Sequence, residues 1–170
     1  MSFICSQNNN IKRIFSLVKT LRQTYGSKIN CTSEHAEDQF AFPTLAQMKK
    51  ATDAELRALG FGYRAPYIIK SLDMIEEKGG EEFLLGLRQK SLEKCREELT
   101  ELHGVGNKVA DCIALFSLDQ ASCVPVDTHV FQIAKKFKFI SGSTTLTAST
   151  YQQINEAFVK KYGDKAGWAH

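Results

Sequence analysis

Apolar residues recur along this chain at the three- and four-residue spacing of amphipathic helices, and alternating strand patterns are missing. The spacing predicts a first helix from Ile11 to Tyr25, with Gly26 as a left-handed C-terminal residue. Its apolar positions are Ile11, Ile14, Phe15, Val18, Leu21 and Tyr25. Because later segments repeat this pattern, the predicted fold class is all-α.

Capping and stop signals mark the next two helices. Thr52 and Glu55 form a capping box that opens a short helix, which Gly60 ends. Pro66 is expected as the first residue of the following helix, which stops at residues 78–80. The apolar face of that helix carries Ile69, Leu72 and Ile75. Both helices are amphipathic, so each has one face to bury.

Further helices are predicted after Ser91, from Asn107 or Lys108, and from about Asp127. Their apolar positions are, in that order, Leu92, Cys95, Leu99 and Leu102; Val109, Cys112, Ile113 and Phe116; and Val130, Phe131, Ala134 and Phe137. Val124–Val126 is expected to be extended, since the residue before a proline avoids the helical region. The helices thus continue through the second half of the chain.

A Ser/Thr loop at 141–147 precedes the last complete helix, which a Ser149–Gln152 capping box opens and Gly163 ends. Its inward positions are Ile154, Ala157 and Phe158. Residues 166–170 resemble the first turn of another helix, in which Trp168 is expected to plug the core. This ending suggests a fragment of a longer chain.

The composition is typical of a globular domain. The 170 residues are 43% hydrophobic and 24% charged, which is ordinary for one globular domain. Apolar runs are far shorter than the roughly 18–20 residues that a bilayer requires, and the N-terminus becomes polar too early for a signal peptide. We therefore expect an intracellular protein without membrane contact.

Charge and cysteine content add little more. The five cysteines have no paired or metal-binding spacing and are expected to be reduced. A net charge of +3 is only a weak indication of a polyanionic partner. The candidate chemistry must therefore come from local motifs.

The most specific motif lies between Leu102 and Lys108, where Gly104 and Gly106 allow a tight turn between two helices. The amides that open the second helix form an anion site at its positive end. The alternative is an ordinary helix–helix turn. The third glycine of a dinucleotide fingerprint is absent, since Val109 occupies its place, and no strand precedes the motif.

Lys108 stands in the first turn of the new helix, where a cation is electrostatically disfavoured. Such a site favours the neutral amine, which is the form that attacks carbon. Asp127 is expected to cap its helix, and a capped carboxylate is also oriented to stabilise a developing cation. His129 follows in the same turn and could reach a phosphate; the alternative is a surface histidine.

Residues 102–112 and 124–129 resemble the helix-hairpin-helix DNA glycosylases, and within them the eukaryotic 8-oxoguanine DNA glycosylases. Three further segments carry the same resemblance in the same order: the asparagine run at 3–11, the loop at 59–65, and 162–168. The resemblance therefore covers essentially the whole chain.

This resemblance implies a bifunctional DNA glycosylase and apurinic-site lyase of base excision repair. Lys108 would be the nucleophile that forms a covalent imine with the sugar, and Asp127 would stabilise the sugar cation. Tyr63 would be the wedge in the vacated base stack. The residues implied to hold the orphaned cytosine are Asn8, Arg13 and Arg64. Alternatives are that Asn8 caps the first helix, that Tyr63 belongs to the core, and that Arg64 extends over Tyr67.

The remaining implied sites are the pocket and the hairpin. Cys112 and His170 would line the base pocket, although the family has glutamine at the position of His170 and apolar packing is the alternative for Cys112. Family hairpins also hold a structural cation on backbone carbonyls, here those of Thr100, Leu102 and Val105. The DNA-contacting residues of the hairpin region would be Gly104, Val105, Gly106 and His129.

The resemblance also sets the expected organisation. Residues 1–170 would form the glycosylase core, a multi-helix bundle of two packed parts at about 1–90 and 91–170. The family's N-terminal sheet domain and final helices would be missing. Catalysis would need no cofactor and no iron–sulfur cluster. The expected partner is double-stranded DNA with oxidised guanine, bound by a monomer in the nucleus, with the mitochondrion as a second location.

Two other functions stay open. One is another enzyme of the superfamily, such as an endonuclease III-like pyrimidine glycosylase, although no cysteine follows Cys123 to hold the iron–sulfur cluster that many of those carry. The other is a non-catalytic DNA-binding fragment, in which Lys108 is only one more cation.

Overall fold

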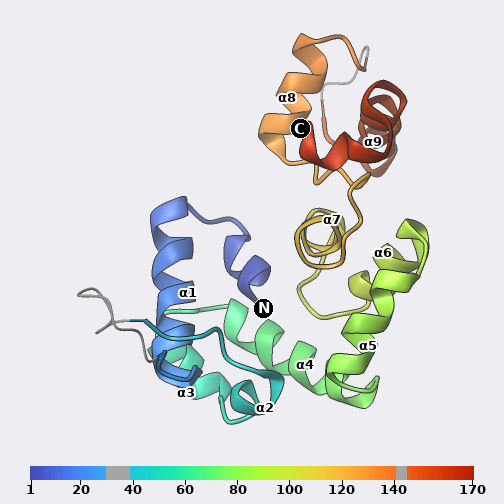
Figure 1. Ribbon diagram of the computed structural model, residues 1–170. Coiled ribbons are helices and arrows are strands. Elements are labelled where there is room, and N and C mark those ends of the chain that lie inside the picture. Colours follow the sequence, from blue (N-terminus) through green and yellow to red (C-terminus); the bar gives the residue numbers. More distant parts are fainter. Residues whose placement is uncertain (30–38, 141–144) are drawn as a thin grey trace. The chain divides into compact units, whose positions relative to one another are not determined.

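The computed structural model describes residues 1–29, 39–140 and 145–170, and within these residues the regular structure is helical (Figure 1). The α-helices are α1 Ile11–Tyr25, α2 Leu45–Met48, α3 Asp53–Ala58, α4 Arg64–Glu77, α5 Glu81–Gly86, α6 Leu92–Thr100, α7 Asn107–Ser117, α8 Thr128–Lys136 and α9 Ala148–Tyr162. Short 3-10 helices are η1 Ser2–Ser6, η3 Leu87–Gln89 and η4 Gly163–Trp168. The all-α prediction is confirmed.

The chain forms two compact units, which are described separately. Unit 1 comprises Met1–Leu84 and Leu102–Gly104, and unit 2 comprises Leu85–Glu101 and Val105–His170. No helix in the described part of the chain is long and apolar enough to cross a membrane. Cys31 and residues 141–144 of the predicted Ser/Thr loop lie outside the described residues.

In unit 1, α1 has the predicted bounds, but the role predicted for Gly26 is wrong. Gly26 has φ −80° and is extended, not left-handed. A Cβ atom at Gly26 would lie only 2.0 Å from the Ala41 carbonyl oxygen. Glycine is therefore required by the close approach of another backbone segment, which lies too far along the sequence for local spacing to reveal.

The next helices of unit 1 begin as their capping signals indicate, with one shift. Thr52 and Glu55 form the predicted capping box of α3, and Gly60 follows it with φ +89°. Helix α4 begins at Arg64, two residues before the predicted start at Pro66. Proline is tolerated at this third position because the first-turn amides have no partner within the helix.

In unit 2, the aliphatic and aromatic side chains of α8 and α9 share one core. Its buried members are Val124, Val126, Val130, Phe131, Ala134, Ile140, Ile154, Phe158 and Ala166. Phe139 and Tyr151 pack against them while staying partly exposed. Helices α6 and α7 begin at the predicted places, α6 after its Ser91 cap and α7 after Gly106.

The start of α9 differs from the prediction. Its N-cap is Thr147, whose hydroxyl accepts a hydrogen bond from the Thr150 amide at 3.1 Å, so Ser149 lies inside the helix. Thr147 precedes Thr150 by the same three positions as Ser149 precedes Gln152, so the local pattern allowed either start. Gly163 ends α9 with φ +59°, as predicted.

Several large side chains predicted to face the core are exposed. Trp168 is 62% exposed and contacts Phe116 edge-on, so it does not plug the core. Ile11, Phe15, Phe116 and Phe137 are also exposed. Periodicity identifies an apolar stripe on a helix, but the neighbouring elements decide how much of the stripe is covered.

Candidate active site

Lys108 is the second residue of α7, at a helix end whose N-cap residue supplies no capping side chain. The N-cap is Gly106, which has φ −93° and makes no side-chain hydrogen bond. The first amides of α7 therefore lack a capping group from the N-cap residue and mark the positive end of the helix dipole. Lys108 itself is partly buried at this end.

Cys112 brings the two candidate catalytic residues into one neighbourhood of unit 2. Its side chain is 5% exposed, and burial raises the pKa of the Cys112 thiol. A hydrogen bond and the charge of Lys108 lower that pKa, whereas the charges of Asp111 and Asp127 raise it. The charges of Lys108 and Asp127, which are nineteen positions apart in the sequence, thus both act on this thiol. The sequence predicts Lys108 from the hairpin motif and Asp127 from its cap, but it does not predict that both act on the same thiol.

Asp127 is the N-cap of α8, as predicted. Its Oδ1 atom accepts hydrogen bonds from the amides of His129 and Val130, both at 2.9 Å. These bonds hold the carboxylate in one orientation at the start of α8. The His129 side chain is exposed in the first turn of α8.

In unit 1, the hairpin residues His103 and Gly104 are held by side chains from two other segments. Ser71 of α4 donates a hydrogen bond to the His103 carbonyl at 2.7 Å, and the Gln7 amide donates one to the Gly104 carbonyl. Gly104 has φ +73°, and a Cβ atom there would lie 2.7 Å from the Tyr67 ring. The position requires glycine on both counts.

Gln7 also contacts Tyr63, the predicted wedge, and Arg64, one of the residues predicted to hold the orphaned cytosine. Its carbonyl accepts hydrogen bonds from the Tyr63 hydroxyl at 3.2 Å and from Arg64 Nη2. Arg64 Nη2 also donates to the Asn8 carbonyl at 3.4 Å, and Arg13 Nη2 donates to the Gly60 carbonyl at 3.2 Å. Unit 1 therefore gathers all four predicted residues, Asn8, Arg13, Tyr63 and Arg64, around Gln7 and the loop at 59–65.

The structure decides between the alternatives for these residues. Asn8 does not cap α1, because the cap is Asn10, which accepts a hydrogen bond from the Arg13 amide at 3.0 Å. Tyr63 is 47% exposed and so is not a core residue. Arg64 is only 4% exposed and lies over the Tyr63 ring, 4.5 Å from its centroid, not over Tyr67.

Residues 1–162 match the family model described as HhH-GPD superfamily base excision DNA repair protein. The chain belongs to this superfamily. The family resemblance predicted from the motifs is thereby confirmed.

Similar HhH-GPD proteins include two eukaryotic ones. The chain is 43% identical to "N-glycosylase/DNA lyase OGG1" of Arabidopsis thaliana, over 99% of this chain and 46% of the relative. It is 34% identical to "N-glycosylase/DNA lyase" of Saccharomyces cerevisiae, over 99% of this chain and 51% of the relative. The chain therefore spans about half the length of these relatives.

A solved structure extends the similarity to the HhH-GPD fold. The crystal structure of Clostridium acetobutylicum 8-oxoguanine glycosylase/lyase, in complex with double-stranded DNA containing cytosine opposite 8-oxoguanine, superposes with a TM-score of 0.82. The sequence identity is 28%, and the match covers 99% of this chain and 54% of that one. The helical arrangement is thus shared with a glycosylase of known structure.

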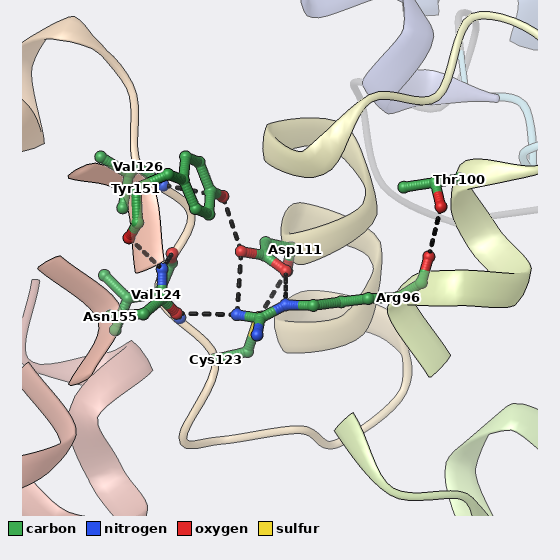
Figure 2. A network of polar contacts seen from close by, with 8 residues as sticks. All are labelled: Arg96, Thr100, Asp111, Cys123, Val124, Val126, Tyr151 and Asn155. Carbon is green, nitrogen blue, oxygen red and sulfur yellow. Dashed lines mark hydrogen bonds and ion pairs between the residues drawn. The ribbon is translucent and has the colours of Figure 1, made fainter. Parts of the chain in front are cut away.

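A buried polar network that was not predicted from the sequence lies beside the candidate site of this HhH-GPD chain (Figure 2). Asp111 of α7 is fully buried and pairs with Arg96 of α6, with Nε–Oδ1 at 2.5 Å and Nη2–Oδ2 at 3.1 Å. Tyr151 and Asn155 of α9 join the same network. The available signal was Asp111 itself, an acidic residue inside an apolar run, because a buried carboxylate requires a partner.

Cys112 does not line the cavity that His170 lines. His170 lines a cavity of about 220 Å³ in unit 2, and its Nδ1 atom is 2.5 Å from the Gly167 carbonyl oxygen. The other lining residues are Val130, Ile133, Phe137, Phe139, Phe158, Lys161, Tyr162 and Ala169. Cys112 is not among them, so the shared base pocket stays a prediction.

The predicted cation site at the hairpin also stays a prediction. Its ligands would be the backbone carbonyls of Thr100, Leu102 and Val105, which the sequence does not mark. Among the described residues, no group of three or more His, Cys, Asp or Glu side chains could hold a metal ion. A cation at the hairpin would therefore depend on main-chain oxygen ligands.

Proposed function

We propose that this chain is the core of a bifunctional DNA glycosylase and apurinic-site lyase that excises oxidised purine, namely 8-oxoguanine opposite cytosine. The observation that carries the proposal is that Lys108, in the first turn of α7, and the oriented carboxylate of Asp127, at the start of α8, both act electrostatically on the Cys112 thiol of unit 2. An amine and an oriented carboxylate in one partly buried site supply the nucleophile and the cation stabiliser of this reaction.

In the proposed reaction, the Lys108 amine attacks the sugar carbon that carries the damaged base. The bond between that carbon and the base breaks, the base leaves with a proton, and the sugar ring opens to give an imine with Lys108. Elimination from the imine then releases the strand on the 3′ side. Hydrolysis of the imine would return Lys108 as a free amine for the next cycle.

Asp127 would act in the first step through its charge. As the bond to the base breaks, positive charge develops on the sugar, and an oriented carboxylate lowers the energy of that state. Its two hydrogen bonds to the amides of α8 prevent the carboxylate from rotating away. The same group can accept a proton from the attacking amine.

The proposed DNA-binding residues divide between the units. In unit 1, Tyr63 would enter the vacated stack while Asn8, Arg13 and Arg64 hold the orphaned cytosine. Around the hairpin, Gly104, Val105, Gly106 and His129 would contact the phosphate backbone. The proposed location is the nucleus, where such DNA is found, and the proposed form is a monomer.

Borohydride trapping on a duplex with 8-oxoguanine opposite cytosine tests this proposal. Borohydride reduces an imine to a stable amine, so the wild-type chain should give a permanent protein–DNA adduct. Lys108→Gln should abolish both the adduct and base release while changing DNA affinity only a few-fold, because phosphate contacts dominate binding. DNA binding without any adduct in the wild type would favour a non-catalytic DNA-binding fragment.

A matched lysine controls for the loss of charge. Lys94 lies on the exposed surface of α6, where it pairs with Glu97 at 2.8 Å. Lys94→Gln should therefore trap as wild type does. An adduct that persists in Lys108→Gln would mean that another amine is the nucleophile.

A further inference from the structure

Residues 124–126, which lead into Asp127, are buried and lie outside any helix, and no strand pairs with them in the described residues. Val124 is 0% and Val126 1% exposed, so their backbone polar groups require partners. Side chains of α9 provide them (Figure 2). Asn155 accepts from the Val124 amide at 3.3 Å and donates to the Val124 carbonyl at 3.0 Å. The Tyr151 hydroxyl accepts from the Val126 amide at 3.2 Å.

The Tyr151 hydroxyl is itself anchored. It donates a hydrogen bond to Asp111 Oδ2 at 2.6 Å, and Arg96 fixes the same carboxylate from its other side. Burial and the Asp111 carboxylate both raise the pKa of Tyr151, so the hydroxyl keeps its proton and remains a donor. Because the Tyr151 hydroxyl donates its proton to Asp111, the lone pairs of its oxygen are free to accept the hydrogen bond from the Val126 amide.

The hydrogen bonds between Asp111 and Tyr151 and between Tyr151 and Val126 join the two segments that carry the candidate catalytic groups. Asp111 lies one turn after Lys108 on α7, and Val126 is the residue directly before Asp127. The chain of contacts therefore runs from α7 through Asp111 and Tyr151 to the backbone that enters the Asp127 cap.

We propose that Tyr151 is a positioning residue for the reaction, because its hydroxyl, held by Asp111, fixes the Val126 amide and thereby the Asp127 carboxylate. The inference rests on the proposed function. Tyr151 does not touch the reacting atoms and acts only through Asp127. Its removal should slow the chemical step without weakening DNA binding.

Tyr151→Phe tests this role because it keeps the ring and removes only the hydroxyl. With enzyme in excess over the lesion duplex, we expect the single-turnover rate to fall about three- to tenfold, the effect of one lost positioning hydrogen bond. The dissociation constant for the duplex should stay within twofold. If the wild-type chain releases the base and Tyr151→Phe does so at the same rate, the role of Tyr151 is overturned while the proposed function stands.

A double-mutant cycle separates positioning from simple destabilisation. If Tyr151 acts through Asp127, then Tyr151→Phe should cause no further loss of rate in the Asp127→Asn background. An equal loss in both backgrounds would show a merely structural effect and overturn the proposal. Ile154→Val is the matched stability control, since Ile154 is fully buried on the same helix and makes no polar side-chain contact. It should leave the rate unchanged, and a similar loss there would also overturn the role.

A second variant covers the case in which Tyr151→Phe does not fold. Asp111→Asn keeps an acceptor for the Tyr151 hydroxyl but removes the charge that strengthens the bond. We expect a two- to threefold slower single turnover, which again disappears in the Asp127→Asn background. An unchanged rate in folded Asp111→Asn overturns the proposal, and a wild-type chain that gives no adduct overturns the proposed function together with it.

Discussion

At the residue scale, Asp127 combines a structural and a proposed chemical task in one side chain. Its Oδ1 atom caps α8 through two hydrogen bonds, and its charge reaches the thiol of Cys112. The cap depends on an acceptor oxygen, whereas cation stabilisation depends on the negative charge. The two tasks can therefore be separated by a substitution that keeps the oxygen and removes the charge.

Asp127→Asn makes that separation, because asparagine is about as good an N-cap as aspartate. We expect the free energy of unfolding to change by less than about 1 kcal/mol. The single-turnover rate of base release should fall by about 10²- to 10³-fold, as when a preorganised electrostatic group is lost. Rapid-quench kinetics and urea unfolding measure the two quantities. An unchanged rate would reduce Asp127 to a plain cap.

Arg64 is a second residue whose burial changes how its role is understood. At 4% exposed, its Nη2 atom binds the carbonyls of Gln7 and Asn8, and its Nε atom is buried without a hydrogen bond among the described residues. Asn8 has a left-handed φ of +42°. Arg64 is thus placed to hold the Asn8 backbone in an unusual conformation as well as to offer a donor.

Arg64→Ala should erode the proposed preference for cytosine opposite the lesion by about 1–3 kcal/mol, the value of one good base contact. The preference is the ratio of base-release rates on duplexes that differ only in the opposite base. Arg57→Ala is the control, since Arg57 is an exposed arginine of the same unit that pairs with Asp53. If base release falls equally on all duplexes, Arg64 contributes to general duplex binding and not to recognition of the opposite base.

At the element scale, the two hairpin glycines differ in what requires them. Gly104 has φ +73° and lies against the Tyr67 ring, whereas Gly106 has φ −93° and no atom within 4 Å of the position of a Cβ. The fold therefore demands glycine at 104 only. Open space at Gly106, before the uncapped amides of α7, is what a phosphate would need to approach.

Gly104→Ala should accordingly destabilise the protein by more than about 1–2 kcal/mol, because alanine is strained at positive φ and its methyl group would clash with Tyr67. Gly106→Ala should lower the free energy of unfolding by about 1 kcal/mol or less. It should weaken the free energy of duplex binding by at least the same amount. Urea unfolding and fluorescence anisotropy measure the two effects. Equal stability losses in both variants would contradict this division.

At the scale of the whole molecule, buried thiols make stability depend on alkaline pH. Burial raises the pKa of Cys5, Cys95, Cys112 and Cys123. The folded state therefore keeps these protons above the ordinary thiol pKa of about 8.5, while the unfolded state releases them. Since the unfolded state then binds fewer protons, the free energy of unfolding falls as pH rises.

Stability should be fully present at pH 7 and decline above about pH 8.5, by about 1 kcal/mol per thiol one pH unit higher. Urea unfolding under reducing conditions at pH 7 and pH 9.5 measures this. Cys123→Ala removes one titrating thiol and should make the decline shallower, whatever its own cost in packing. A free energy that is equal at both pH values would show that these thiols are not buried as described.

Local sequence signals were enough to predict the helical fold class, the places where most helices begin and end, and the family. These follow from caps, glycine stops and periodicity, which act between residues three or four positions apart. The hairpin with Lys108 and the cap at Asp127 were recognisable for the same reason. Both lie within short, contiguous segments.

Contacts between distant segments determine which apolar side chains are covered and which charged side chains pair. Only the folded chain shows that Phe15 and Trp168 are exposed and that Asp111 pairs with Arg96 and Tyr151. These contacts join residues 15 and 40 positions apart. Their energies depend on burial and on partners from other helices, and no local pattern records either one.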